Sequence, residues 1–382
     1  MAIPEGAHKA VYEIGGVKRS LLDLLGRFAE PQYQVKGILR LSDLHLKVGE
    51  PARFRFDNEL VPVPQGEPLT APVVEALILP LLNAAQVRRL MGMPPDDVDS
   101  SFDWDERRLS FRVNVFHDRD GLAATLRALP RFVPDIEQVG FPNDVWREIV
   151  ELNQGLIIVT GITGSGKSTT IASLLKHINR KQRARIITLE DPVEYVMASE
   201  HAMISQREVG THVASFEEGL RSALREDPDI IFVGEMRDRE TTSLALTAAE
   251  TGHLVLSTLH TRDTKGVISR IVDMFPAERN KELSTQLSFS LSLVLGQKLV
   301  TRLNGQGRCA AVEVLRVTPA VGHLIRSGNW HQIYGQLETG SKVGMISMEK
   351  HLAQLCREGV ISRDEAMRHA NDPVILNYLN TG

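Results

Sequence analysis

The stretch 156–170, LIIVTGITGSGKSTT, decides the fold of this chain. Four consecutive apolar residues and then a glycine-rich turn predict a buried strand that runs into a loop. Beyond the loop, Ile171, Leu174, Leu175 and Ile178 recur at the spacing of one helical face, so a helix follows. Strand, G-x-x-x-x-G-K-S loop and helix in this order are typical of a phosphate-binding loop, or P-loop.

The residue types in this loop suit a nucleotide. Its glycines let consecutive backbone N–H groups point at a triphosphate, and the helix N-terminus adds partial positive charge. Lys167 can reach the β- and γ-phosphates, and the hydroxyl of Ser168 can ligate Mg²⁺. We therefore expect a nucleoside triphosphate to bind at Gly161, Thr163, Gly164, Ser165, Gly166, Lys167, Ser168 and Thr169.

Composition excludes several other classes of protein. The 382 residues are 42% hydrophobic and 24% charged, which is typical of a globular protein of two or three domains. A net charge of -4, without a basic stripe, argues against a nucleic-acid partner. Two distant cysteines, Cys309 and Cys356, can build neither a disulfide framework nor a zinc ribbon. No apolar run approaches the ~20 residues of a membrane span, so we expect a cytosolic protein that meets membranes through partners.

The chain divides by pattern into an N-terminal and a C-terminal part. Residues 1–36 predict an N-terminal extension with a short amphipathic helix from Val17 to Phe28. Residues 37–130 predict a separate α+β unit, because polar and apolar residues alternate at Ser42–Leu46 and Arg53–Phe56. A hairpin is expected at residues 101–115.

A proline-spaced linker over residues 131–143 is expected next. From 144 to 382, short apolar strands separated by helical patterns predict a mostly parallel sheet covered on both faces. This part ends in a helical region, residues 320–382. The fold class is therefore α/β.

Polar side chains follow the strands of the predicted sheet. The strand 185–189 is followed by Glu190 and Asp191, the strand 230–233 by Gly234 and Glu235, and the strand 254–259 by His260. Open α/β sheets bind ligands at the carboxyl ends of their strands. The sequence therefore predicts that these side chains converge on the nucleotide held by the P-loop.

Four stretches resemble the four motif boxes of the secretion ATPase superfamily, in the order of that superfamily. They are residues 161–169, 187–195 (ITLEDPVEY), 220–238 (LRSALREDPDIIFVGEMRD) and 247–261 (TAAETGHLVLSTLHT). Residues 205–210 (SQREVG) and 42–48 (SDLHLKV) are similar to the type IV pilus retraction ATPases, the PilT/PilU family.

The resemblance implies an architecture, a cofactor and partners. It implies a PAS-like N-terminal domain and a RecA-like ATPase domain, joined in a ring-shaped homohexamer that hydrolyses ATP with Mg²⁺. It implies work in pilus retraction and twitching motility at the inner membrane, through a pilus platform protein. A paralogous retraction ATPase is a further candidate partner.

The resemblance also implies roles for individual residues. Lys167 and Ser168 would hold phosphates and Mg²⁺, and Glu235 would lie beside the metal. Glu190 would polarise the attacking water, although the roles of Glu190 and Glu235 can be exchanged.

Four further residues complete the expected catalytic set. His253 and His260 would sense or contact phosphate, and Arg112 and Arg127 would meet the nucleotide of a neighbouring subunit. Arginines at that place would supply the positive charge that a transferring phosphoryl group needs.

One stretch departs from the family. Retraction members carry the signature A-I-R-N-L-I-R-E near the C-terminus, and residues 320–327 here read AVGHLIRS, with Gly322, His323 and Ser327 at the altered positions. This departure supports one alternative to a retraction motor, an accessory paralogue that binds ATP and a partner motor. A separate alternative is an assembly (extension) ATPase, although those relatives usually carry a tetracysteine zinc element.

Overall fold

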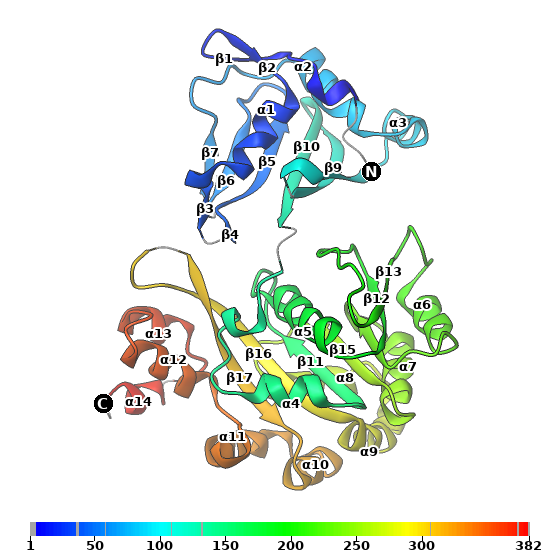
Figure 1. Cartoon of the computed structure of the whole chain (residues 1–382), viewed down its shortest axis with the longest axis vertical. Helices are drawn as coiled ribbons and strands as arrows, with labels where there is room; N and C mark the ends of the chain where they lie inside the picture. The colour runs from blue at the N-terminus through cyan, green and yellow to red at the C-terminus, as the bar shows by residue number, and fades with distance from the viewer. Residues whose placement is uncertain are drawn as a thin grey trace. The chain divides into compact units, whose positions relative to one another are not determined.

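A computed structural model describes residues 5–35, 38–57, 59–107, 109–130, 133–305, 307–372 and 374–380 (Figure 1). Its contacts divide the chain into two units, Met1–Phe132 and Val133–Gly382. The division falls inside the segment 131–143, for which the sequence predicts a linker. Part of that segment is packed, because Ile136 is buried in a core of the second unit and Lys176 forms an ion pair with Asp135 at 2.9 Å.

The first unit is built on a six-stranded sheet in the order β7-β6-β5-β10-β9-β8, in which all neighbours are antiparallel. The alternation that predicts strands at Ser42–Leu46 and Arg53–Phe56, and the hairpin predicted at 101–115, are confirmed. The strands are β5 (Leu41–Lys47), β6 (Arg53–Phe56), β7 (Glu59–Pro62), β8 (Val98–Trp104), β9 (Leu109–Asp118) and β10 (Gly121–Pro130).

The segment before residue 36 packs into the core of this unit. Val17–Arg19 forms strand β2, which pairs with β1 (Tyr12–Ile14), so the helix predicted from Val17 begins only at Leu21. Ser20 fixes that start, because its hydroxyl accepts the N–H of Asp23. Phe28 is fully buried and packs edge-on against aromatic rings of the sheet. The helices of the unit are α1 (Leu21–Gly26), α2 (Ala71–Ile78) and α3 (Ala84–Leu90).

The second unit contains a seven-stranded sheet in the order β13-β12-β14-β15-β11-β16-β17 (Figure 1). Its strands are parallel except β17, which is antiparallel to β16. The mostly parallel sheet of the prediction is therefore confirmed. The strands are β11 (Gly155–Thr160), β12 (Arg185–Glu190), β13 (Met203–Glu208), β14 (Ile230–Val233), β15 (Leu254–Leu259), β16 (Leu291–Thr301) and β17 (Arg308–Arg316).

Side chains alternate between the two faces of this sheet. In the central strand β11, Leu156 and Ile158 pack into one core, and Ile157 and Val159 into the other. The first core is closed by the helices α6 (Phe216–Ala223), α7 (Arg239–Glu250), α8 (Thr264–Val272), α9 (Asn280–Ser290) and α10 (Pro319–Arg326). The second core is closed by α4 (Val145–Glu151) and α5 (Lys167–Lys181).

The end of the chain is helical, as the pattern of residues 320–382 predicts. After α10 come α11 (Ile333–Thr339), α12 (Met348–Arg357), α13 (Arg363–His369) and α14 (Ile375–Asn380). Ser362 caps the N-terminus of α13, where its hydroxyl accepts the N–H of Glu365. Helices α12 to α14 pack on Val300, Cys309 and Ala311 of the β16–β17 pair. Within the residues described, no helix has the length and apolar character that a membrane crossing needs.

Candidate nucleotide site

The P-loop connects β11 to α5 and has room only for glycine at two positions. A Cβ on Gly161 would lie 2.4 Å from the carbonyl oxygen of Gln297, and a Cβ on Gly166 would lie 2.7 Å from its side-chain nitrogen. Gly166 also has a φ of 88°, which L side chains rarely adopt, and it forms the N-cap of α5. The close packing of the loop against β16 is therefore one reason for glycine at positions 161 and 166.

Gln297 holds the loop from the neighbouring strand, and the local sequence patterns do not predict it. Its side chain is buried in β16. Its Nε2 donates to the carbonyl of Ser165 at 2.8 Å, and its Oε1 accepts the hydroxyl of Thr170 at 2.7 Å. The amide therefore ties the loop to the first turns of α5.

Lys167 is the buried cation of the site, with an exposed fraction of 8%. Its Nζ donates to the carbonyls of Gly161 at 2.9 Å and Ile162 at 3.2 Å. Burial lowers the pKa of Lys167, whereas the carboxylates of Glu235 and Glu194 raise it.

The other predicted loop residues lie around Lys167. Thr163 is exposed on the loop, and Ser168 is half-buried in the first turn of α5. The hydroxyl of Thr169 is 2.8 Å from that of Tyr195.

Glu190 ends β12 and is buried, with 8% of its surface exposed. Its Oε1 accepts the hydroxyl of Thr188 at 2.6 Å and the Nε2 of Gln206 at 3.1 Å. Burial raises the pKa of Glu190, and the two hydrogen bonds oppose that effect. Gln206 also donates to the carbonyl of Tyr195 at 2.9 Å, so the carboxyl group is held in one place.

Glu235 follows β14, and one of its carboxylate oxygens lies near both the guanidinium of Arg237 and the imidazole of His260. The Nε of Arg237 lies 2.7 Å from its Oε2, and the Nε2 of His260 lies 3.6 Å from the same oxygen. Arg237 also approaches Asp191 at 3.9 Å, so it spans the ends of β12 and β14. The motif analysis did not single out Arg237, although it follows Glu235 by only two residues.

The strand order brings the predicted acids and His260 to one edge of the sheet. Strands β12, β14, β15 and β11 are parallel neighbours, so their carboxyl ends meet there. Thr160, the last residue of β11, joins two of these ends: its hydroxyl donates to the carbonyl of Leu259 at 3.0 Å and accepts the N–H of Thr261 at 2.9 Å. The strand order therefore places these side chains on the sheet edge that carries the P-loop.

His253 is a correction to the predicted set. It precedes β15, and its carbonyl accepts the N–H of Gly155 at the start of β11. At about 3.3 Å per residue, six strand residues place it roughly 20 Å from His260, on the amino edge of the sheet. Its Nδ1 lies 3.0 Å from the carbonyl of Ala248. A contact with phosphates at the P-loop of the same chain is therefore excluded.

Arg112 and Arg127 belong to the first unit, where they lie opposite each other on β9 and β10. The Nε of Arg127 donates to Asp43 Oδ1 at 2.8 Å. The side chain of Arg127 is 60% exposed, although that of Asp43 is buried. A buried carboxylate thus orients an arginine that is still accessible.

The altered stretch 320–327 lies on the amino edge of the sheet. Because β17 runs antiparallel to β16, α10 begins at the edge away from the P-loop. Gly322 is buried against α9, where a Cβ would lie 3.5 Å from the carbonyl of Ser288. Arg326 donates to the hydroxyl of Ser288 at 2.9 Å and lies 5.4 Å from the ring centre of Phe289.

The fold and this edge of the sheet define an α/β protein with a candidate nucleotide site. Comparison with known proteins identifies its family: the chain belongs to the Type II/IV secretion system protein family, which matches residues 39–368. It is 45% identical over 319 residues to the uncharacterized protein YggR of Escherichia coli, covering 84% of this chain and 95% of that protein.

Two further comparisons concern pilus retraction. The chain is 42% identical over 335 residues to the type IV pilus retractation ATPase PilT of Pseudomonas aeruginosa, covering 87% of this chain and 95% of that protein. Its structure is similar to the crystal structure of the pilus retraction motor PilT with bound ADP. That match has a TM-score of 0.79 and 38% identity, and it covers 92% of this chain and 97% of the other.

Proposed function

We propose that this chain is an ATP-hydrolysing motor that powers type IV pilus retraction and so twitching motility. One observation carries the proposal: Glu190, Glu235 and His260 lie on the same sheet edge as the P-loop, at the ends of adjacent parallel strands. The similarity to PilT, which extends over most of both chains, supports retraction as the work performed.

We further propose the domain assignment that the family resemblance implies. The antiparallel sheet and helices of residues 37–130 would form a PAS-like domain, and residues 144–382 a RecA-like ATPase domain. Residues 1–36 would extend the first of these, and residues 131–143 would link the two. The protein would work in the cytoplasm and reach the inner membrane through the pilus platform protein.

The site fits Mg²⁺ bound together with a nucleotide. In the described part of the chain, no group of three His, Cys, Asp or Glu side chains is arranged to hold a metal by itself. Mg²⁺ commonly takes one or two protein oxygens and completes its shell with phosphates and water. The Ser168 hydroxyl and the Glu235 carboxylate would supply the protein oxygens, and the ion would neutralise phosphate charge.

The two glutamates divide the remaining chemistry. Lys167 would hold the β- and γ-phosphates. The raised pKa of Glu190 suits a group that accepts a proton from the attacking water, since a base works best near the operating pH. Glu235, beside Arg237 and His260, would lie next to the metal. If Glu235 were the base and Glu190 lay beside the metal, the site would still use the same two glutamates.

Arginines from a second copy of the chain would complete the site. Arg127 is held by Asp43 and largely exposed, and Arg112 lies directly across from it. In the homohexamer that the family resemblance implies, these arginines would face the nucleotide of a neighbour and stabilise charge on its transferring phosphoryl group.

Deletion of the gene, scored for surface pili, tests the function. Loss of a retraction motor should leave cells with more surface pili and without twitching motility. The wild-type gene should restore motility, and the Lys167→Ala variant should not. Cells without pili would instead indicate an assembly ATPase and contradict the proposal.

A second candidate is an accessory retraction ATPase that acts with a paralogous motor. It is favoured by one observation, the altered stretch 320–327 on the amino edge of the sheet. Under this alternative the deletion strain would keep some retraction, because the partner motor would still work.

A further inference from the structure

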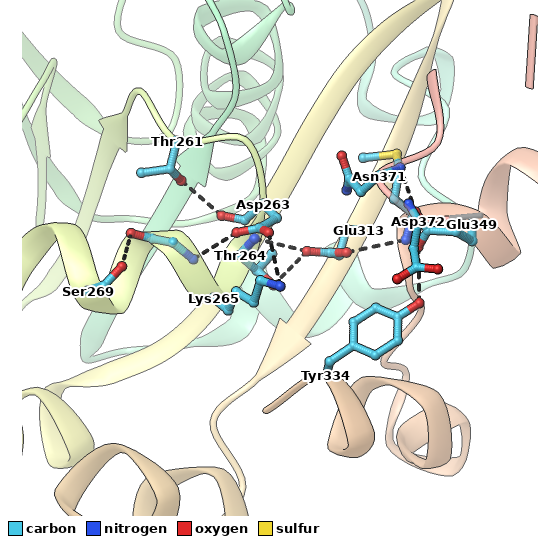
Figure 2. A network of polar contacts seen from close by, with 12 residues as sticks. Thr261, Asp263, Thr264, Lys265, Ser269, Glu313, Tyr334, Glu349, Asn371 and Asp372 are labelled. Carbon is cyan, nitrogen blue, oxygen red and sulfur yellow. Dashed lines mark hydrogen bonds and ion pairs between the residues drawn. The ribbon is translucent and has the colours of Figure 1, made fainter. Parts of the chain in front are cut away.

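A buried glutamate connects the loop after β15 with the C-terminal helices (Figure 2). Glu313 lies in β17 and is 2% exposed. Its Oε1 accepts the backbone N–H of Thr264 at 2.9 Å and the Thr264 hydroxyl at 2.7 Å. Its Oε2 accepts the backbone N–H of Met348 at 3.3 Å. One carboxyl group therefore serves both α8 and α12.

The two contacts fall at positions where helices need acceptors. Thr264 and Met348 are the first residues of α8 and α12, and the first N–H groups of a helix have no partner within it. The partial positive charge of a helix N-terminus also favours a carboxylate. Burial raises the pKa of Glu313, and the hydrogen bonds from Thr264 oppose that effect. Each carboxyl oxygen is thus committed to one helix.

On the side of α8, hydrogen bonds continue to the base of the P-loop. The hydroxyl of Thr261 donates to the carbonyl of Asp263 at 2.9 Å, and Asp263 Oδ1 accepts the N–H of Gly266 at 2.8 Å (Figure 2). The hydroxyls of Thr261 and Thr160 lie 2.8 Å apart. Thr160 immediately precedes the P-loop, and Thr261 immediately follows His260.

On the side of α12, the contacts continue to a second buried carboxyl group. Glu349 follows Met348 and has no exposed surface. Its Oε1 accepts the N–H groups of Asn371 at 2.8 Å and Asp372 at 3.2 Å (Figure 2). The hydroxyl of Tyr334 lies 3.4 Å from its Oε2. The start of α12 is therefore fixed to the segment that follows α13.

A lysine of β16 lies among these acids. The Nζ of Lys298 donates to the carbonyl of His369 at 2.7 Å and to the side-chain oxygen of Asn371 at 2.5 Å. Burial lowers its pKa, and the charges of Glu349 and Glu313 raise it. The preceding residue of the strand, Gln297, donates to the P-loop carbonyl of Ser165. Strand β16 therefore contacts both the loop and the acid cluster.

We propose that Glu313 is a positioning residue for ATP hydrolysis, which fixes the His260 loop through α8 and joins it to helix α12. The inference rests on the proposed function. Since one carboxyl group holds both helix starts, a change at the nucleotide reaches α12, and a change at the start of α12 reaches His260.

The variant Glu313→Gln tests this assignment. Glutamine keeps the shape of the side chain but has one acceptor oxygen, so it can serve α8 or α12 and not both. Amide hydrogen exchange of the full-length protein is measured with and without ADP in peptides 161–170, 260–272 and 347–357. In the wild type, ADP should slow exchange in all three. In Glu313→Gln, ADP should still slow exchange in 161–170, while the response in 347–357 should fall at least fivefold.

Kinetics give a second readout. Glu313→Gln should lower kcat for ATP about tenfold and leave KM within about twofold, because the P-loop contacts remain. Thr264→Val keeps the N–H donor and deletes only the hydroxyl, so it should lower kcat by a smaller factor. If Glu313→Gln fails to fold, Thr264→Val takes its place in both experiments. A kcat and an exchange response equal to those of the wild type in Thr264→Val would then overturn the assignment.

The matched control is Glu365→Gln. Glu365 is also a buried glutamate of the C-terminal helices, and it accepts the N–H of Thr301 at 2.7 Å. Its variant should keep the wild-type kcat and the wild-type response to ADP.

The inference would be overturned by an equal loss of kcat in Glu365→Gln, or by an unchanged ADP response of peptide 347–357 in Glu313→Gln. Neither result would contradict ATP binding. Absence of ADP protection at 161–170 in the wild type would instead overturn the proposed function itself.

Discussion

The two edges of the seven-stranded sheet differ in what their side chains can do. The carboxyl edge gathers the P-loop with Glu190, Glu235 and His260, and a buried hydrogen bond from Thr188 holds Glu190. The amino edge carries α9 and α10, and there Phe289 is 73% exposed. Its altered stretch, 320–327, is far from the nucleotide site. We infer that substitutions at the two edges will separate ATP chemistry from contacts with other proteins.

The largest effect is expected from the cation of the carboxyl edge. Lys167→Ala should weaken ATP binding about a hundredfold or more, because the variant loses a buried charge that we propose holds the phosphates. Isothermal titration with ATP measures it. Lys181→Ala, at the exposed far end of the same helix, is the control and should bind as the wild type does. Equal affinities in both variants would place the nucleotide elsewhere.

Mixing inactive subunits tests whether the carboxyl edge is shared between copies. Arg127→Ala and Glu235→Gln should each be inactive alone. If a site takes the glutamate from one subunit and the arginine from its neighbour, random 1:1 mixing leaves about a quarter of the sites intact. ATPase activity should therefore recover toward that fraction and should depend on protein concentration. Mixed subunits that stay inactive would mean that the sites are not shared in this way.

Acid should destabilise the second unit through one histidine. Burial lowers the pKa of His351 to about 4, and its Nδ1 accepts the N–H of Val312 at 2.8 Å. The unfolded state therefore binds a proton below about pH 6.5 while the folded state does not. Stability is present above pH 6.5 and is lost as the pH falls toward 4, by about 2 kcal/mol between pH 7 and pH 5.

Urea unfolding at the two pH values measures this loss. The variant His351→Leu should show a smaller drop in stability between pH 7 and pH 5. His323→Gln, at an exposed position of the amino edge, should keep the drop of the wild type. The same drop in His351→Leu and in the wild type would refute the assignment.

The smallest effect on ATPase activity is expected at the amino edge. The triple substitution Gly322→Arg, His323→Asn and Ser327→Glu restores the family signature. It should change kcat less than about threefold, which is under ~1 kcal/mol of barrier, and it should alter retraction in cells. The new arginine has to displace Arg326, whose Nη1 lies 3.4 Å from the Cβ position of residue 322. Loss of ATPase activity in a variant that still assembles would show that this edge belongs to the catalytic machinery.

Local patterns predict the carboxyl edge well. The P-loop and the acids after β12 and β14 follow from short apolar runs that end in polar residues, and each run forms a parallel strand. His253 shows the limit of this reasoning. It lies near His260 in the sequence, but a strand of six residues places the two histidines on opposite edges.

The residues that sequence reasoning missed act through long-range contacts. Gln297 reaches Ser165, and Glu313 reaches Thr264, across many residues of intervening chain. Strands β13, β16 and β17 also lie outside the four predicted strands. The run 287–293 (LSFSLSL) alternates apolar residues with serine, which is typical of a strand, but its first four residues belong to α9, so periodicity does not mark where β16 begins. Only the packed sheet shows which strands stand beside the P-loop.

The central claim, that the carboxyl edge is one ATP-hydrolysing site, is tested most directly by ATP binding and turnover in Glu235→Gln. The exposed Glu240, five residues further on, provides the matched control Glu240→Gln. We expect Glu235→Gln to bind ATP within about threefold of the wild type and to hydrolyse it about a hundredfold more slowly, while Glu240→Gln does both normally. Wild-type turnover in Glu235→Gln and in Glu190→Gln alike would contradict the account.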